Sequence, residues 1–341
     1  MSKESKTSNS FDVEFAKSVL RQVKNDLLHD KTRSFKILWH GGEPLLWGIN
    51  NYTEILSFIE SEFRGYNYKT SVQTNLSLIN EEYIDLFLKN NVSIGCSLDG
   101  PKEIHDSQRV TADGKGSFDM IWEKLELCRK KGLQIGCIVV GSKNHIGKIS
   151  LLYQFMCEFN IGFKFNPVFN EGEANKNYDD LGVTPDEYAA MSIELFDLWF
   201  HDNIHQVNNS MFVDIASALI TGKSSHCLYN KNCQKNILAV SSNGDVVPCG
   251  RFCNVSLSKY AYGNLHTESL ASILKKIKLS EIYNRYQYIK DSSCGKCIYV
   301  EICHGGCLYD GFDFKSKSFL CGAYQKIFSH VSNRLKEVKL L

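Results

Sequence analysis

Eight cysteines in the last third of this 341-residue chain are the residues whose type and spacing most clearly indicate chemistry. They form the runs Cys227-x5-Cys233-x15-Cys249 and Cys294-x2-Cys297-x5-Cys303-x3-Cys307, followed by Cys321. One 4Fe-4S cluster is held by four cysteine thiolates, so eight patterned cysteines predict two clusters. Structural zinc is the alternative, because paired Cys-x2-Cys units also bind zinc, and either metal would stabilise a loop-rich segment.

A glycine-rich turn near the start of the chain, His40-Gly41-Gly42-Glu43-Pro44, is the second candidate site. Two glycines let backbone groups approach a ligand closely, and Glu43 can accept charge-assisted hydrogen bonds from an ammonium group. The same residues also suit an ordinary strand-to-helix turn. The turn alone does not decide between these two interpretations.

Composition excludes several classes of partner. The formal net charge is +1, which gives no long-range field to attract nucleic acid or an anionic membrane. No apolar run reaches transmembrane length, and the first thirty residues do not resemble a signal peptide. We therefore expect a cytoplasmic protein with neither nucleic acid nor membrane as a partner. Reducing cytoplasm leaves its thirteen cysteines available for metal rather than for disulfides.

Strand and helix patterns alternate through the first half of the chain. Strands are predicted at 35–39, 69–73, 92–98, 134–140 and 162–168, and helices at 15–27, 52–63, 81–89, 117–131 and 147–159. Strands separated by such helices pair in parallel and place the site at their carboxyl ends. Gly42, Asn75, Asp99 and Asn166 lie there. The pattern predicts most of a parallel barrel.

The second half has a different character. Thr184-Pro185-Asp186-Glu187 is typical of a helix start, and 237–240 with 246–248 predict a hairpin around Asn243-Gly244. We predict a partial barrel at 1–170, a helical bridge at 171–225 and a cysteine-rich domain at 226–341. The remaining cysteines inside regular patterns are expected to be buried core residues, namely Cys96, Cys128, Cys137 and Cys157.

Taken together, these motifs resemble radical S-adenosylmethionine (SAM) enzymes that bear a SPASM domain. The resemblance rests on Gly41 to Pro44, Gln73-Thr74-Asn75, Ser97-Leu98-Asp99-Gly100 with His105, Asp106 and Arg109, and the terminal cysteines. It implies an α/β fold, a partial parallel (β/α)6 TIM-like barrel that here misses its first strand, plus a small cysteine-rich SPASM domain. It also implies that Gly42 and Glu43 contact the SAM amino group, and that Ser97 and Arg109 hold its carboxylate or ribose.

The resemblance further implies how the clusters are held. It assigns Cys227, Cys233, Cys249 and Cys307 to one auxiliary 4Fe-4S cluster, and Cys294, Cys297, Cys303 and Cys321 to the other. A third 4Fe-4S cluster, which cleaves SAM, is held in the family by a Cys-x3-Cys-x2-Cys loop after the first strand. The 341 residues contain no such run. We therefore expect an N-terminally truncated chain that performs no radical chemistry alone.

The function implied for the complete protein is a peptide maturase. A deoxyadenosyl radical would drive a carbon-carbon or carbon-sulfur crosslink in a ribosomally made peptide, with flavodoxin or ferredoxin as electron donor and an anaerobic setting. Anaerobic sulfatase maturation is one alternative; those relatives carry an aspartate after Pro-Cys, where this chain has Gly250. The other alternative is a non-catalytic iron-sulfur protein that binds peptides or transfers electrons.

Overall fold

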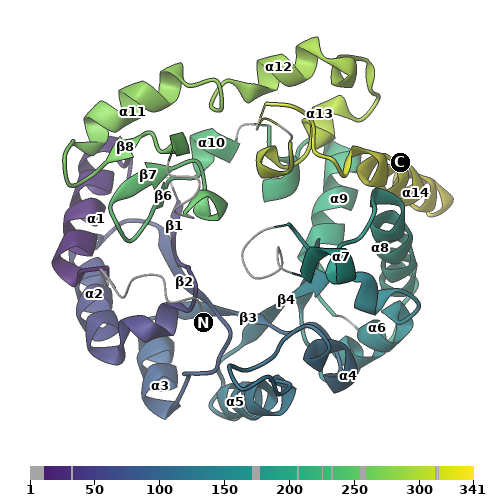
Figure 1. The fold of residues 1–341 in the computed structure, drawn as a ribbon, viewed down its shortest axis with the longest axis horizontal. Helices are drawn as coiled ribbons and strands as arrows, with labels where there is room; N and C mark the ends of the chain where they lie inside the picture. The colour runs from purple at the N-terminus through teal and green to yellow at the C-terminus, as the bar shows by residue number, and fades with distance from the viewer. Residues whose placement is uncertain are drawn as a thin grey trace. The chain divides into compact units, whose positions relative to one another are not determined.

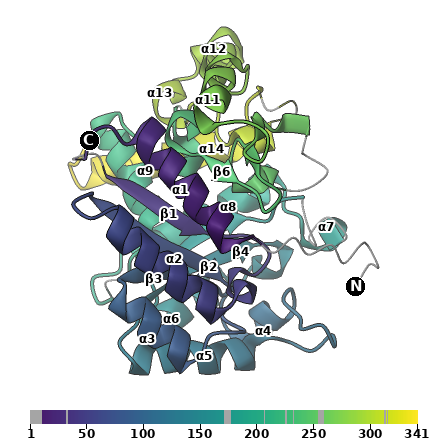
Figure 2. The same ribbon diagram turned by 90° about the vertical axis from the view of Figure 1, so that its left-hand side faces the viewer.

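The computed structural model describes residues 11–31, 34–170, 177–205, 207–224, 226–231, 233–253, 259–311, 313 and 315–341. Their contacts define two compact units, and each unit draws on both halves of the chain. The first unit comprises Met1–Thr74, Leu78–Ile94 and Gln234–Tyr283, and the second comprises Asn75–Ser77, Gly95–Cys233 and Asn284–Leu341. Figures 1 and 2 follow the elements along the chain.

The strands of the main sheet follow one another in chain order, β1-β2-β3-β4-β5, as expected for strands joined by crossover helices. In the first unit, β1 (Phe35–Trp39) pairs in parallel with β2 (Tyr68–Thr74). The 3-10 turn η1 (Pro44–Trp47) and α2 (Ile49–Glu62) connect them. The helices α1 (Val13–Leu27) and α3 (Glu81–Lys89) complete this part of the unit.

The first unit also contains a small antiparallel sheet from the cysteine-rich segment. Its strands are β6 (Ala239–Val240), β7 (Asp245–Val247) and β8 (Gly263–Asn264), and α11 (Leu270–Leu279) follows. A shared core joins this sheet and α11 to α1 through Val19, Val246, Leu265, Leu270, Ile273 and Ile277. Figure 1 shows α11 beside α1. The Leu270 N–H also donates to Gln22 Oε1 at 2.8 Å. Segments far apart in sequence therefore stabilise one another.

The second unit holds the remaining parallel strands and most of the helices. Here β4 (Ile135–Gly141) pairs in parallel with β5 (Phe163–Pro167), and the last three residues of β3 (Val92–Ser97) belong to the same unit. Its longer helices are α5 (Phe118–Lys130), α6 (Ile149–Glu158), α8 (Pro185–Phe200), α9 (Ser210–Thr221) and α14 (Cys321–Glu337). The shorter ones are α4 (Lys102–Asp106), α7 (Tyr178–Leu181), α12 (Arg285–Asp291) and α13 (Val300–Cys303), while α10 (Cys233–Asn236) begins at the unit's edge.

Two polar devices fix α8 within the second unit. Thr184 and Glu187 form a capping box at its start, which satisfies backbone N–H groups that the helix itself leaves unpaired. Near its end, Asp197 accepts hydrogen bonds from His330 Nε2 at 2.8 Å and Arg334 Nε at 2.9 Å. Both partners lie on α14, so these hydrogen bonds hold the helix that begins with Cys321 against α8.

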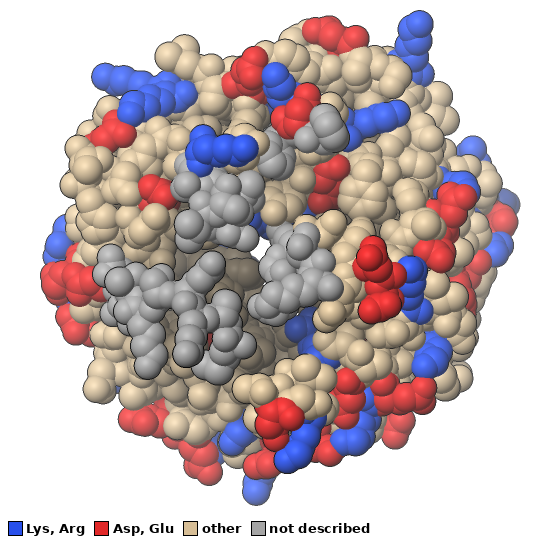
Figure 3. Space-filling model, in the orientation of Figure 1, with Lys and Arg blue, Asp and Glu red and all other residues tan. Residues whose placement is uncertain are grey.

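The predicted α/β class and the five strands are confirmed, and each strand lies within two residues of its predicted bounds. The four cysteines predicted to be core residues are buried. The predicted division into three consecutive domains stays a prediction. The two compact units each combine segments from both halves of the chain, so they do not correspond to consecutive domains. Acidic and basic side chains are interspersed on the face shown in Figure 3. No described helix has the length and apolar character to cross a bilayer.

Candidate functional site

The glycine turn after β1 combines accessible backbone with a fixed carboxylate. Gly41 has φ +150°, a conformation that favours glycine, and a β-carbon on Gly42 would meet nothing within 4 Å. Glu43 Oε1 accepts hydrogen bonds from the Leu45 N–H at 3.0 Å and from Thr74 Oγ1 at 2.7 Å. Glu43 is thus fixed beside the carboxyl ends of β1 and β2. This geometry suits a ligand that carries an ammonium group.

In the second unit, Asp99 is the centre of a buried network directly after β3. It is fully buried and accepts hydrogen bonds from Gln108 Nε2 at 2.6 Å, the Val140 N–H at 2.8 Å and Arg109 Nε at 2.5 Å. Burial alone would raise the pKa of Asp99, but the charge of Arg109 and these hydrogen bonds lower it below its ordinary value. The carboxylate therefore stays ionised and fixes Arg109.

Two buried histidines hold the backbone of Asp99 from both sides. His105 Nδ1 accepts from the Asp99 N–H at 3.2 Å, and His145 Nε2 donates to the Asp99 carbonyl at 2.9 Å. His145 Nδ1 in turn accepts from the Ser142 N–H at 3.2 Å, so both rings are neutral. Burial lowers the pKa of His105 to about 4 and also lowers the pKa of His145. The sequence motif contained His105, but nothing in the sequence marked His145.

The four residues predicted to contact SAM occupy two places. Ser97 ends β3 and Arg109 reaches the same strand end through Asp99, whereas Gly42 and Glu43 belong to the first unit. The Arg109 side chain keeps 29% of its surface exposed, and Asp99 is its only carboxylate partner among the described residues. Asp99 therefore leaves part of the Arg109 side chain uncovered. Their roles as ligand contacts stay predictions.

Four cysteines of the terminal array line one small pocket, which we call the thiol pocket. They are Cys294, Cys297, Cys303 and Cys321, accompanied by Tyr299 and Phe328. Burial raises the pKa of the Cys303 thiol to about 12, so a metal would have to displace a firmly held proton. Sulfur is the only side-chain donor that these four residues offer, which favours an iron-sulfur cluster or zinc over hard cations. This set equals one of the two predicted ligand groups.

The other predicted ligand group is distributed over short turns. Cys227 begins the 3-10 turn η4 (Cys227–Tyr229), Cys233 begins α10, and Cys307 precedes η8 (Leu308–Asp310), all within the second unit. Cys249 precedes η5 (Gly250–Phe252) in the first unit. His304 is buried, and its Nδ1 lies 2.6 Å from the Tyr229 carbonyl. That bond joins the Cys227 turn to the loop before Cys307.

Arg285 organises the loop from Cys303 to Cys307, and sequence reasoning missed it. Its Nη1 donates to the Gly306 carbonyl at 2.9 Å, and its Nη2 donates to the carbonyls of Gly305 at 3.2 Å and Ser316 at 2.7 Å. Both glycines have positive φ, and a β-carbon on Gly305 would lie 2.6 Å from Ile289. Glycine is therefore required in this loop, and an arginine upstream of the Cys-x3-Cys spacing carries no motif that would identify it.

Comparisons with protein families match both the strand-and-helix segment and the cysteine-rich segment of this chain. Residues 8–155 match the radical SAM superfamily, and residues 227–298 match an iron-sulfur cluster-binding domain, SPASM. A cysteine-type anaerobic sulfatase-maturating enzyme of Clostridium novyi is 27% identical over 315 residues, which covers 91% of this chain and 82% of the relative. A serine-type enzyme of Bacteroides thetaiotaomicron is 23% identical and covers 86% of this chain and 75% of its own length.

Solved structures show the same fold. Native anSMEcpe with bound AdoMet superposes with a TM-score of 0.81 at 25% identity, covering 96% of this chain and 90% of that one. Streptococcus suis SuiB bound to its precursor peptide SuiA gives a TM-score of 0.60 at 18% identity, covering 89% and 67% respectively. The second likeness concerns the fold alone.

Proposed function

This chain is a radical SAM protein with a SPASM domain, and from that premise we propose that it binds SAM and two auxiliary 4Fe-4S clusters as part of a maturase that modifies a residue of a peptide or protein. The SAM-cleaving cluster that such a maturase needs has no Cys-x3-Cys-x2-Cys ligand run in these 341 residues, so we propose no radical chemistry for them alone. The observation that carries the proposal is the presence of both family domains in one chain. The relatives with assigned activity act on sulfatases, as their names state. A polypeptide substrate is therefore the class that the comparisons favour.

In this proposal, the chain's own residues bind and orient SAM. Glu43 accepts hydrogen bonds from the methionine ammonium group of SAM, beside the exposed backbone of Gly42. Ser97 and Arg109 hold the carboxylate or the ribose of SAM. Arginine suits this role because its planar fork pairs with two oxygens, and Asp99 fixes that fork in place. Bound SAM and the clusters supply one-electron chemistry. The residues contribute by holding the reacting groups at fixed positions.

We propose the eight array cysteines as the auxiliary ligands: Cys227, Cys233, Cys249 and Cys307 for one cluster, and Cys294, Cys297, Cys303 and Cys321 for the other. The thiol pocket supports the second set, because all four of its residues line one pocket. A flavodoxin or ferredoxin is the proposed electron donor. Zinc remains the chemical alternative at these thiols.

SAM binding tests the first half of the proposal. We would load the anaerobically purified chain with SAM and measure affinity by equilibrium dialysis. Glu43→Gln removes the ionised acceptor and should weaken binding about tenfold, which corresponds to roughly 1.4 kcal/mol. Glu194→Gln, at an exposed position on α8, serves as the matched control. Equal affinity in wild type and Glu43→Gln would contradict the assigned role.

The type of modification depends on one position. Gly250 stands where the sulfatase-maturating enzymes carry an aspartate, so we propose crosslink formation ahead of side-chain oxidation. Sulfatase maturation is the second candidate, favoured by relatives that match most of this chain. A β-carbon on Gly250 would meet none of the described residues within 4 Å, so Gly250→Asp can be tested.

The two candidates differ in how they treat a maturase substrate. A second structure of anSMEcpe contains bound AdoMet and the Cp18Cys peptide. We would titrate the chain with that peptide and follow binding by fluorescence anisotropy. A crosslinking enzyme should bind that peptide no better than a scrambled control, both before and after Gly250→Asp. Specific, saturable binding by the wild-type chain would favour sulfatase maturation instead.

A further inference from the structure

Arg285 is a buried cation whose charge has no carboxylate partner. Only 8% of the residue is exposed, and its hydrogen bonds go to backbone carbonyls of the Cys303–Cys307 loop and Ser316. No acidic side chain pairs with it among the described residues, and its buried Nε has no hydrogen-bond partner there. Burying an uncompensated charge is costly, so the site is built for an anion that sits close to the guanidinium.

The neighbouring sulfurs identify that anion. Four proposed ligands lie near enough to Arg285 for their charges to act on it, namely Cys307, Cys233, Cys303 and Cys294. Two of these cysteines belong to each proposed auxiliary cluster. A 4Fe-4S core with four thiolates is a net anion, and its potential depends on nearby charge and hydrogen bonds.

We propose that Arg285 is a positioning residue that acts as the shared counter-ion of both auxiliary clusters and raises their reduction potentials. This inference rests on the proposed cluster ligands. A fixed cation stabilises the reduced, more negative cluster more than the oxidised one, so it eases acceptance of an electron. The same side chain shapes the loop that supplies one ligand to each cluster.

The test compares potentials in the cluster-loaded protein. Arg285→Gln should shift the reduction equilibrium about tenfold toward the oxidised clusters, a fall of about 59 mV for a one-electron couple. Arg285→Lys keeps the charge and should retain most of the wild-type potential. Lys290→Gln is the control. Lys290 lies on the same helix but pairs with Glu301 at the surface, so its replacement should leave the reduction potentials of the clusters unchanged. Potentials would be read from electron paramagnetic resonance during redox titration.

The outcomes separate this inference from the cluster assignment. Full iron content with unchanged potentials in Arg285→Gln overturns the counter-ion role and leaves the ligands standing. If Arg285→Gln disrupts the Cys303–Cys307 loop so that iron is lost, Arg285→Lys decides, because it keeps the positive charge. A reduction potential in Arg285→Lys below that of wild type would contradict a role that depends on charge. A wild-type protein that takes up no iron refutes the proposed function itself.

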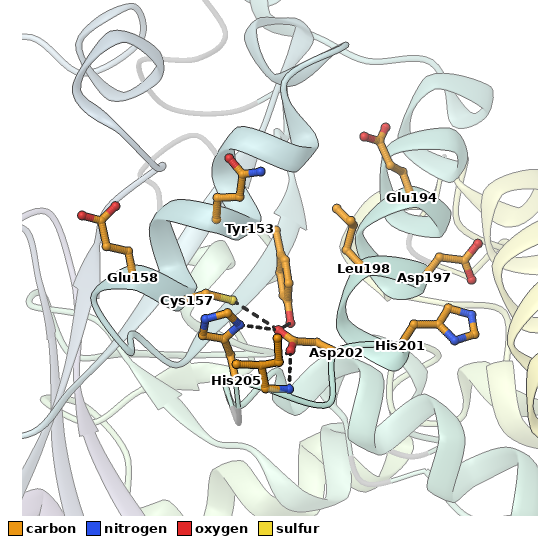
Figure 4. Close-up of a pocket in the computed structure, with 11 residues that line it drawn as sticks. Tyr153, Cys157, Glu158, Glu194, Asp197, Leu198, His201, Asp202 and His205 are labelled. Atoms are coloured by element: carbon orange, nitrogen blue, oxygen red, sulfur yellow. Dashed lines mark hydrogen bonds and ion pairs between the residues drawn. The ribbon is translucent and has the colours of Figure 1, made fainter.

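A separate group of metal-binding side chains lies in the second unit, where α6 and the segment after α8 border a cleft of about 940 Å³ (Figure 4). Tyr153 and Cys157 come from α6, and Asp202 and His205 come from the segment. Asp202 Oδ2 accepts from Tyr153 Oη at 2.7 Å and from Cys157 Sγ at 3.7 Å, and it lies 2.9 Å from His205 Nδ1. Three side chains thus converge on one carboxylate oxygen.

The surroundings hold this group ready for a cation. The Asp202 side chain is 9% exposed and Cys157 is buried, whereas the His205 side chain is 46% exposed at the mouth of the cleft. Asp202 Oδ1 accepts the backbone N–H groups of Ile204 and His205, both at 2.8 Å, which fixes the carboxylate. No lysine or arginine pairs with Asp202 in the described part of the chain.

We infer that Cys157, Asp202 and His205 form a site for one zinc ion. Their ligand atoms, one sulfur, one oxygen and one nitrogen, all lie within 4.8 Å of one another, and the cleft gives a water access to the fourth position. Binding would replace the thiol proton of Cys157 by the metal and release that proton to solvent. The site differs chemically from the thiol pocket, which offers sulfur alone.

Zinc alone is the probe for this site, added to the cluster-loaded protein so that the array cysteines are already occupied. Wild type should retain one equivalent of zinc after desalting, and His205→Gln and Cys157→Ala should retain none. His201→Gln is the control, because Figure 4 shows its side chain turned away from the group. X-ray absorption should report one sulfur ligand. Equal zinc content in wild type and His205→Gln, or zinc bound by four sulfurs, would overturn the inference.

Discussion

At the scale of single residues, Asp99 determines how the strand-end site is held. Its carboxylate fixes Arg109, Gln108 and the backbone of Val140, and its own backbone is held by two neutral histidines. The motif Ser97-Leu98-Asp99-Gly100 could be identified from the sequence. The donors around Asp99 could not, because Val140 and His145 come from a later strand and turn that only folding brings near.

Replacing Asp99 by Asn should therefore be severe. Only one oxygen remains in the substituted amide, so its NH2 group would face either the donors Arg109 Nε and Gln108 Nε2 or the donor Val140 N–H, and the guanidinium would lose its charged partner. Breaking a buried ion pair in this way costs about 3–5 kcal/mol. Asp113→Asn is the control, because its exposed carboxylate contacts only surface groups, Lys115 and Thr111 Oγ1, among the described residues, and it should lower the free energy of unfolding far less. Urea unfolding of the two variants would check this, and similar midpoints would contradict it.

His105 should make the protein sensitive to acid. Its folded pKa is about 4 and its ordinary value is 6.5, so the unfolded chain takes up the proton first as pH falls. Stability is complete above about pH 6.5 and declines between 6.5 and 4, by roughly 3 kcal/mol at most. His105→Asn retains a hydrogen-bond acceptor but does not titrate. Its free energy of unfolding, measured with urea, should fall less between pH 7.5 and 5 than that of wild type. Parallel curves for the two proteins would refute this.

At the scale of elements, periodicity predicted the barrel portion well because each helix and strand there has one apolar face. The capping residues of α8 were equally visible, since Thr184, Pro185 and Glu187 are adjacent in sequence. The packing of α11 on α1 was not predicted, because the apolar pattern of a helix shows which face is buried but not which element covers that face. The spacing marked the eight candidate cluster ligands, and the family resemblance divided them into two sets that stay a prediction; nothing in the sequence marked Arg285.

Ile273→Ala tests the contact between α1 and α11. Ile273 is fully buried in their shared core, so the substitution removes apolar contacts and leaves a cavity. Such changes cost about 2–5 kcal/mol. Leu279→Ala on the same helix is the matched control, because Leu279 is 85% exposed and should change the free energy of unfolding little. Thermal denaturation followed by circular dichroism would compare them, and equal melting temperatures would argue against the shared core.

At the scale of the whole molecule, metal content is the property that most needs measurement. Two auxiliary clusters predict about eight irons per chain after anaerobic reconstitution. Cys297→Ala should lose about four of them and lower soluble yield, because the thiol pocket would lack one ligand. Cys253→Ala, in the same segment but outside both proposed ligand sets, should keep the wild-type iron content. Unchanged iron in Cys297→Ala, or stoichiometric zinc in the wild type, would contradict the assignment.

The joint core of α1 and α11 also bears on how this protein is made. Gln22 and Leu270, which meet across that core, are 248 positions apart, so a ribosome releases the first helix long before its packing partner. During that interval the apolar side of α1 stays open to other nascent chains. Synthesis should consequently depend on chaperone protection, and slowing translation ahead of α11 should increase aggregation.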